Sequence, residues 1–151
     1  MKLTLIAGLP GTGKTYLAKQ LEAESGAVRL SRDEIRADLF TAPDYSETEK
    51  AEAFEFMLLV AGYEITQGND VILEGMPFSR RSERDTARNL AVSAGADFEL
   101  IHCVCPDEIA IARIASQDHP AADRNESLYS EVKSRFEPFG DDEEVTEVST
   151  A

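Results

Sequence analysis

An octapeptide near the start of the chain, GLPGTGKT at residues 8–15, constrains the fold more than any other segment. It matches the pattern G-x-x-x-x-G-K-[ST] in full and lies between an apolar run at 2–7 and a stretch with helical spacing at 14–25. A glycine-rich loop in this position presents backbone N–H groups and the positive end of a helix to phosphate oxygens. The alternative is a glycine-rich turn that matches by chance.

The residue types of this phosphate loop indicate a nucleoside triphosphate. Lys14 is expected to reach the β- and γ-phosphates, and the Thr15 hydroxyl is expected to ligate Mg²⁺. A dinucleotide site is excluded because Tyr16 stands where a third small residue is required. We therefore expect ATP with Mg²⁺, bound by Gly8, Leu9, Pro10, Gly11, Thr12, Gly13, Lys14 and Thr15.

The rest of the chain alternates predicted strands and helices. Strands are expected at 2–7, 27–31, 71–75, 98–104 and 145–150, and helices at 14–25, 32–40, 47–67, 80–94, 106–116 and 126–136. This alternation predicts one α/β domain over 1–151, a P-loop NTPase three-layer sandwich. Its sheet is expected to be five-stranded and mostly parallel, with a small helical lid at about 117–126.

The charge balance limits the partners. The formal net charge is −14, from 29 acidic and 15 basic residues, which opposes nucleic acid or an anionic membrane at the general surface. The dispersed acids also suit a protein adapted to high salt, where the screening length falls to about 3 Å. Ordinary acidic proteins reach the same composition, so both alternatives stay open.

Targeting signals are not evident in the sequence. The longest apolar run, FEFMLLVAGY, is too short to cross a bilayer, and the run after Lys2 is too short for a signal peptide. A cytoplasmic location is the default expectation. Cys103 and Cys105 are predicted to be buried thiols on one face of a strand, because C-x-C alone lacks further metal ligands.

The hexapeptide SRDEIR, residues 31–36, supplies the groups that phosphoryl transfer needs. Asp33 follows the second predicted strand and is a candidate general base, and Arg36 lies three residues later on the same helical face. Arg36 is expected to contact the phosphate or the acceptor, and Arg32 to bind substrate. Alternatively, Ser31 and Asp33 cap a helix and Arg36 forms a surface ion pair.

Glu74 ends the buried strand VILE. Ligands of parallel sheets collect at the carboxyl ends of the strands. Glu74 is therefore a candidate to hold Mg²⁺ through water or to bind the acceptor, and the alternative is an acid that caps a helix.

Other arginines are candidates for anion binding. Four of the ten arginines lie within nine residues, Arg80, Arg81, Arg84 and Arg88, and the last three share a helical face. Arg81 and Arg84 are expected to bind an anionic substrate, with ion pairs to neighbouring acids as the alternative.

Two arginines near the expected lid are further candidates. Arg124 is expected to close over the triphosphate, and Arg113 is a weaker candidate for a nucleotide contact. His119, in the same loop, is as consistent with a plain loop residue as with a catalytic one.

The segments GLPGTGKT, SRDEIR, VILEGMPFSRRSERD and RFEPF together resemble the small P-loop kinases grouped with the kinase domain of polynucleotide kinase and, more distantly, zeta toxins. The resemblance implies that Asp33 is the general base for a 5′-hydroxyl, that Arg36 contacts the reacting phosphate, and that Arg124 aids the transition state. The chain departs from polynucleotide kinases at Glu74 and Gly75, where those enzymes show an Asp-Thr-Asn type stretch, and in lacking a basic lid.

Three functions remain open from the sequence. The first is an ATP- and Mg²⁺-dependent kinase that phosphorylates a hydroxyl of a polynucleotide, a nucleoside or a small metabolite. The second is a nucleotide-binding regulatory module or slow NTPase, and the third is a toxin-like kinase acting on a nucleotide sugar. The expected partners are ATP and a hydroxyl-bearing substrate, with nucleic acid disfavoured by charge and no membrane.

Overall fold

A computed structural model describes residues 1–116 and 125–151. Within these residues every expected strand and helix is present, and each boundary lies within one residue of the predicted one. The expected lid at about 117–126 falls almost entirely outside the described residues. The strands are β1 (Lys2–Ala7), β2 (Val28–Ser31), β3 (Val71–Glu74), β4 (Asp97–Val104) and β5 (Val145–Ser149). The helices are α1 (Lys14–Ser25), α2 (Arg32–Leu39), α3 (Glu47–Thr66), α4 (Arg81–Ser93), α5 (Asp107–Ser116) and α6 (Glu126–Arg135).

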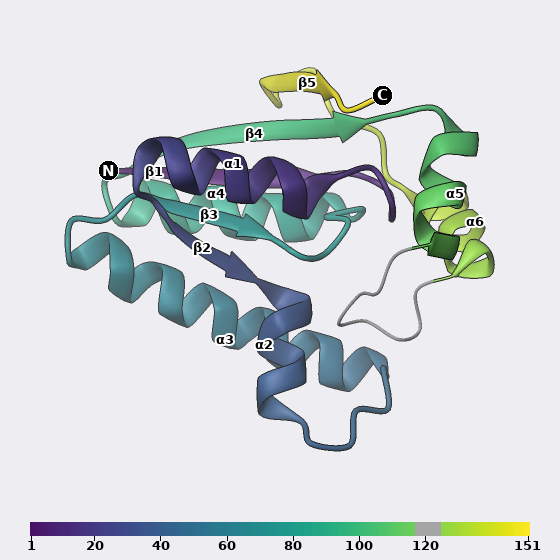
Figure 1. Cartoon of the computed structure of the whole chain (residues 1–151). Coiled ribbons are helices and arrows are strands. Elements are labelled where there is room, and N and C mark those ends of the chain that lie inside the picture. Colours follow the sequence, from purple (N-terminus) through teal and green to yellow (C-terminus); the bar gives the residue numbers. More distant parts are fainter. Residues whose placement is uncertain (117–124) are drawn as a thin grey trace.

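The five strands form one sheet in the order β2-β3-β1-β4-β5. All four pairings are parallel, so the described sheet is parallel throughout rather than mostly so. The carboxyl ends of the strands therefore meet at one edge, toward which the arrows point in Figure 1. Helices α5 and α6 lie at that end of the sheet.

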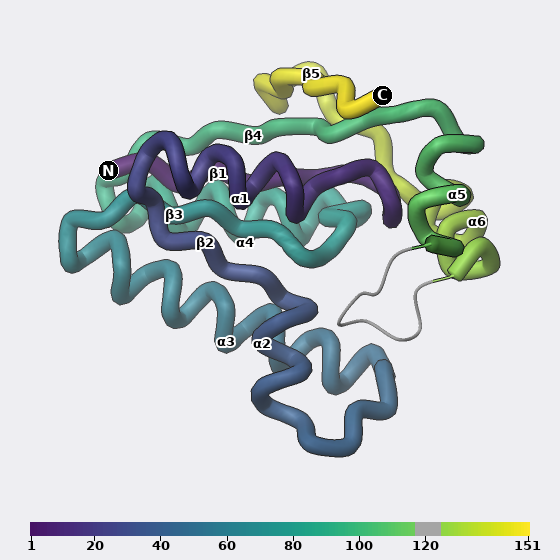
Figure 2. The backbone as a smooth tube through the Cα atoms, in the orientation of Figure 1, coloured from purple at the N-terminus to yellow at the C-terminus, as the bar shows by residue number. Residues whose placement is uncertain are grey.

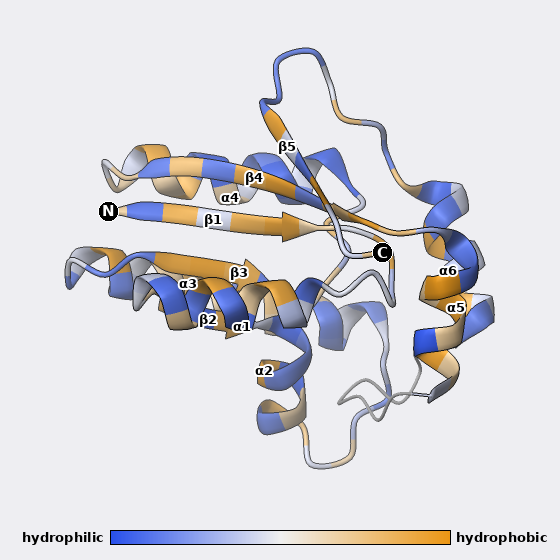
Figure 3. Ribbon diagram, turned by 45° about the horizontal axis from the view of Figure 1, so that its top comes forward, coloured by the Kyte–Doolittle hydropathy of each residue, from blue (hydrophilic) through white to orange (hydrophobic). Residues whose placement is uncertain are grey.

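Helices cover both faces of the sheet and make the expected three-layer sandwich. Helices α3 and α4 pack on one face, where the buried core includes Leu5, Met57 and Leu73. Helix α1 packs on the other face over Ile6, Ile72 and Cys103. Strands β1, β3 and β4 are mainly apolar in Figure 3, as parallel strands covered on both sides require.

Strand β2 continues directly into α2, with Ser31 as both the last strand residue and the N-cap. Helix α2 and the segment after it project beyond the sheet edge, and α3 then returns along the sheet, as the tube in Figure 2 shows. Gly75 has φ 84°, and a Cβ there would meet Ser31 Oγ at 2.3 Å. This close approach requires glycine and places the end of β3 against the start of α2.

The two cysteines differ from the expectation in one respect. Cys103 is buried, and its thiol donates to the Thr12 carbonyl oxygen at 3.0 Å. Burial raises the pKa of the Cys103 thiol. Cys105 follows the last residue of β4 and is only half-buried, so the prediction of two equally buried strand thiols is wrong for Cys105.

Across residues 1–116 and 125–151, none of the helices combines the length and the apolar character needed to span a bilayer.

Candidate active site

The phosphate loop joins β1 to α1. Gly13 is the N-cap of α1 with φ 90°, and as a glycine it has no side chain to occupy the first N–H groups of the helix. The Nζ atom of Lys14 donates to the carbonyl oxygens of Gly8 and Leu9, each at 2.9 Å. The ammonium group is thus folded over the loop on the side where phosphate oxygens would lie.

A hydroxyl and a carboxylate meet beside the loop. Thr15 Oγ1 donates to Glu74 Oε1 at 2.9 Å, and Arg29 Nη1 donates to Glu74 Oε2 at 2.6 Å. Glu74 is fully buried, and this burial raises the pKa of its carboxyl group, although Thr15 and Arg29 act in the opposite direction. Arg29 also contacts Glu34 at 2.8 Å. The guanidinium group therefore holds a buried carboxylate next to the phosphate loop.

These two oxygen-bearing side chains fit a magnesium site. Mg²⁺ is usually held by one or two protein oxygens, with the remaining positions taken by substrate phosphates and water. Within the described ranges, no group of three or more His, Cys, Asp or Glu side chains could hold a metal ion by itself. A cation at Thr15 and Glu74 would therefore depend on the nucleotide for its other ligands.

The first turn of α2 brings Asp33 and Arg36 together. Arg36 Nη2 lies 3.3 Å from Asp33 Oδ1, and Arg32 Nη2 lies 3.7 Å from the same oxygen. Asp33 is largely buried and Arg36 is 1% exposed. Ser31 Oγ accepts from the Glu34 N–H, so Ser31 caps the helix as the alternative foresaw, while Arg36 is a buried residue and not a surface partner.

A cleft of about 430 Å³ connects the phosphate loop to these residues. Its lining includes nine of the candidate site residues, namely Pro10, Gly11, Gly13, Lys14, Thr15, Arg32, Asp33, Arg36 and Glu74. Helix α6 contributes Leu128, Val132 and Arg135, and the segment after β3 contributes Met76, Pro77, Ser79 and Arg80. The cavity is thus bounded by elements from both ends of the chain.

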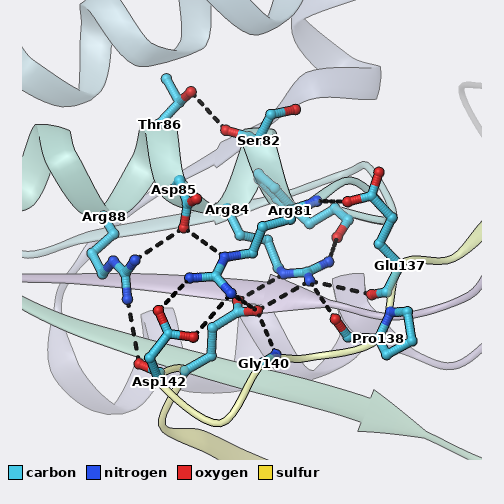
Figure 4. Close-up of polar contacts among 12 residues, drawn as sticks. Arg81, Ser82, Arg84, Asp85, Thr86, Arg88, Glu137, Pro138, Gly140 and Asp142 are labelled. Carbon is cyan, nitrogen blue, oxygen red and sulfur yellow. Dashed lines mark hydrogen bonds and ion pairs between the residues drawn. The ribbon is translucent and has the colours of Figure 1, made fainter.

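Arg81 and Arg84, expected to bind an anionic substrate, are not among the residues that line this cleft. Arg84 is 1% exposed, and its guanidinium donates to the Phe78 and Glu137 carbonyl oxygens and to Glu143. Figure 4 shows its contacts with Glu137 and Pro138. Arg81 contacts Asp85 at 2.9 Å and Asp142 at 2.6 Å. Both side chains hold the segment 137–143 against α4, which agrees with the ion-pair alternative and corrects the substrate-binding prediction.

Arg113 lies outside the cleft, behind the phosphate loop. Its guanidinium donates to the Thr150 carbonyl oxygen at 2.6 Å and approaches the Gly11 carbonyl oxygen at 3.5 Å. Together with Gly13, Tyr16 and Thr150 it lines a second cavity of about 410 Å³. A nucleotide contact by Arg113 stays a prediction. Arg124 and His119 lie outside the described residues.

Three cations of the cleft, Lys19, Lys50 and Arg135, were missed from the sequence, and Arg80 was noted only as a member of the arginine cluster. The four come from separate segments that the fold brings together. No local pattern around the three missed residues distinguishes them. Arg29, the partner of Glu74, was also missed, although a charge inside the otherwise apolar strand VRLS indicates a buried counter-ion.

A parallel sheet with a phosphate loop after β1, a carboxylate after β2 and a shared cavity defines a kinase-like P-loop NTPase fold. The chain belongs to the AAA domain family AAA_33, whose model matches residues 3–139. Among curated protein sequences, none matches the chain significantly.

Solved structures extend this comparison. A candidate kinase from Chloroflexus aurantiacus is 25% identical, with a TM-score of 0.78 over 99% of this chain and 88% of that one. A sugar kinase from Janibacter is 17% identical, with a TM-score of 0.73 over 98% and 84%. One chain of the Pnkp1/Rnl/Hen1 RNA repair complex is 21% identical to this one, with a TM-score of 0.64 over 90% of this chain and 46% of that chain. The resemblance to small P-loop kinases is confirmed.

Proposed function

We propose that this protein is an ATP-dependent kinase that transfers the γ-phosphoryl group to a hydroxyl of an acceptor. One observation carries the proposal, namely that the phosphate loop and the Asp33 carboxylate line the same cavity. A binding module needs only the loop, whereas a transferase needs a proton acceptor facing the γ-phosphate. Kinases among the structures that resemble this chain support the same class of reaction.

In the proposed reaction, the Asp33 carboxylate accepts the proton of the acceptor hydroxyl. The hydroxyl oxygen forms a bond to the γ-phosphorus, the bond from that phosphorus to the β,γ-bridging oxygen breaks, and ADP leaves. Lys14 offsets the charge that develops on the phosphoryl oxygens. Mg²⁺, when bound by Thr15 and Glu74, would supply further neutralisation of the phosphates.

The Asp33→Asn variant tests this assignment. We expect it to bind ATP with unchanged affinity by titration calorimetry, and to lose acceptor-stimulated ADP release by about 10²- to 10⁴-fold because the proton acceptor is gone. Asp38→Asn is the matched control, since Asp38 lies on the exposed side of the same helix. If Asp33→Asn keeps full acceptor-stimulated ADP release, Asp33 is not the base, and a regulatory or hydrolytic role becomes the better account.

A further inference from the structure

The guanidinium group of Arg36 lines the cleft without using its terminal donors. The side chain is 1% exposed, yet neither Nη1 nor Nη2 donates a hydrogen bond to any described residue. Nη2 lies 3.3 Å from Asp33 Oδ1, and Nε lies 3.7 Å from Glu49 Oε1. These two ion pairs offset the positive charge of Arg36, but neither has the geometry of a hydrogen bond. Buried donors normally find an acceptor. A ligand in the cleft would supply the missing one.

The group is held in a fixed orientation. The Tyr45 ring lies 4.5 Å from the guanidinium carbon, and Tyr45 itself has φ 56°, which is uncommon for a residue other than glycine. Glu49, also buried, lies beside the Nε atom. A planar guanidinium held in this way matches the two oxygens of a carboxylate or phosphate.

The cleft is positive in a strongly negative protein. Its described lining holds seven of the fifteen Lys and Arg residues but only five of the twenty-nine Asp and Glu residues. The lining therefore carries a formal charge of +2, and the rest of the chain carries −16. Beyond the phosphate loop, α1 and α2, the cations come from α3, the segment before α4, and α6, namely Lys50, Arg80 and Arg135.

The cavity also limits the size of the acceptor. A volume of about 430 Å³ falls in the range of pockets that enclose a small molecule. A polymer that entered the cleft by one end would have to lie across the negative remainder of the surface, which repels a polyanion. Size and charge together favour a small anion over a nucleic acid.

We propose that the acceptor is a small molecule that carries an oxyanion, a carboxylate or a phosphate, beside the hydroxyl that is phosphorylated. Arg36 binds this oxyanion through its terminal nitrogens, and Lys50, Arg80 and Arg135 supply the surrounding positive charge. This inference rests on the proposed kinase function, since an acceptor is required. It goes further by naming the chemical class of that acceptor.

Acceptors that differ only in the anionic group test the inference. ADP release is measured with glycerol, glycerate and glycerol 3-phosphate, with glucose, gluconate and glucose 6-phosphate, and with adenosine, 3′-AMP and a 5′-hydroxyl oligonucleotide. We expect turnover with an anionic small molecule at a kcat/KM at least about tenfold above that of its neutral counterpart, because a charged hydrogen bond is lost in the neutral one. The carboxylate and phosphate members separate the two kinds of oxyanion.

Variants of Arg36 then test whether this residue is the one that causes the preference for anionic acceptors. Arg36→Lys keeps the charge but loses the planar fork, and we expect the KM for the anionic acceptor to rise about 10- to 100-fold. The Kd for ATP measured without acceptor should stay unchanged. Arg88→Gln, at a residue that does not line the cleft and pairs with Asp85, is the control and should leave both constants unchanged.

The outcomes separate the two proposals. Equal kcat/KM for neutral and anionic members, or an Arg36→Lys variant that weakens ATP binding and leaves the acceptor KM unchanged, overturns the oxyanion site while the kinase function stands. Preference for the oligonucleotide over every small acceptor overturns the size argument in the same way. If no acceptor raises ADP release although ATP binds, the kinase function itself fails, and the acceptor class with it.

Discussion

Arg29 and Glu74 form an ion pair beside the phosphate loop, where the proposed function places the phosphate donor. The Glu74 carboxylate is fully buried and receives hydrogen bonds from Thr15 and Arg29, while the Arg29 side chain is 13% exposed. Burying a carboxylate costs free energy unless a cation and donors compensate for it. In the proposed function, Arg29 therefore acts on the nucleotide through Glu74, as a positioning residue.

The substitution Arg29→Met removes this compensation. We expect the free energy of unfolding to fall by about 3 kcal/mol, because an unpaired carboxylate stays buried. Urea denaturation measures the change, with Lys2→Met as the control for loss of an exposed cation.

A double-mutant cycle with Glu74→Gln separates this effect from lost packing. The double variant should be less destabilised than the sum of the two single variants, since neither charge remains buried alone. A strictly additive double variant would show that the two side chains stabilise the fold independently.

Element α4 illustrates what residue spacing can and cannot predict. Spacing correctly places Arg81, Arg84 and Arg88 on one helical face, but it does not say what covers that face. The covering segment, 137–143, is distant in the sequence. Its acids Asp142 and Glu143 bind Arg81 and Arg84, and its Asp142 carbonyl oxygen accepts from Arg88. The cluster in Figure 4 therefore joins α4 to the segment between α6 and β5.

The pair of Arg84 and Glu143 makes this junction dependent on pH. Burial alone would raise the pKa of Glu143, but hydrogen bonds from Arg84 and the Gly140 N–H outweigh it, so the pKa lies below its usual value. A lowered folded-state pKa contributes stability above the unfolded pKa of about 4.3, and that contribution is lost as pH falls through the folded value.

We therefore expect Glu143→Gln to lower the free energy of unfolding by about 2 kcal/mol at pH 7. The difference from the parent protein should shrink as pH falls below about 4.3. Denaturation between pH 3 and pH 7 measures it, and Asp142→Asn, which alters an exposed pair with Arg81, is the control. A difference that stays constant over this range would contradict the ionic role of Glu143.

At the scale of the whole molecule, the topology was predictable and the cleft was not. Alternating apolar and amphipathic stretches and a phosphate loop after β1 predict a parallel sheet whose strand ends carry Lys14, Asp33 and Glu74. The opposite wall, with Lys50 and Arg135, forms only when α3 and α6 fold against this edge, and no local pattern in either helix indicates it. The sequence of an α/β domain therefore predicts which residues lie at the carboxyl ends of its strands more clearly than which helices cover those ends.

The net charge of −14 should make global stability depend on salt. Raising KCl from about 0.05 M to 1 M shortens the screening length from roughly 14 Å to about 3 Å and weakens repulsion among the excess acids. We expect Tm to rise over this range in thermal denaturation. A fall in Tm would mean that ion pairs such as Arg81 with Asp142 outweigh the general repulsion. Measuring ADP release over the same KCl range tests the halophilic alternative, since activity confined to low salt would count against it.

The proposed kinase function requires that the cleft transfer a phosphoryl group and not merely bind or hydrolyse ATP. Incubation of γ-³²P-labelled ATP with the protein and the paired acceptors follows the terminal phosphate itself. We expect the label to appear in an acceptor-derived product in amounts equal to the ADP formed, and we expect Asp33→Asn to abolish the transfer. If the label is recovered only as inorganic phosphate with every acceptor, in amounts equal to the ADP, the protein hydrolyses ATP and the proposed kinase function is wrong.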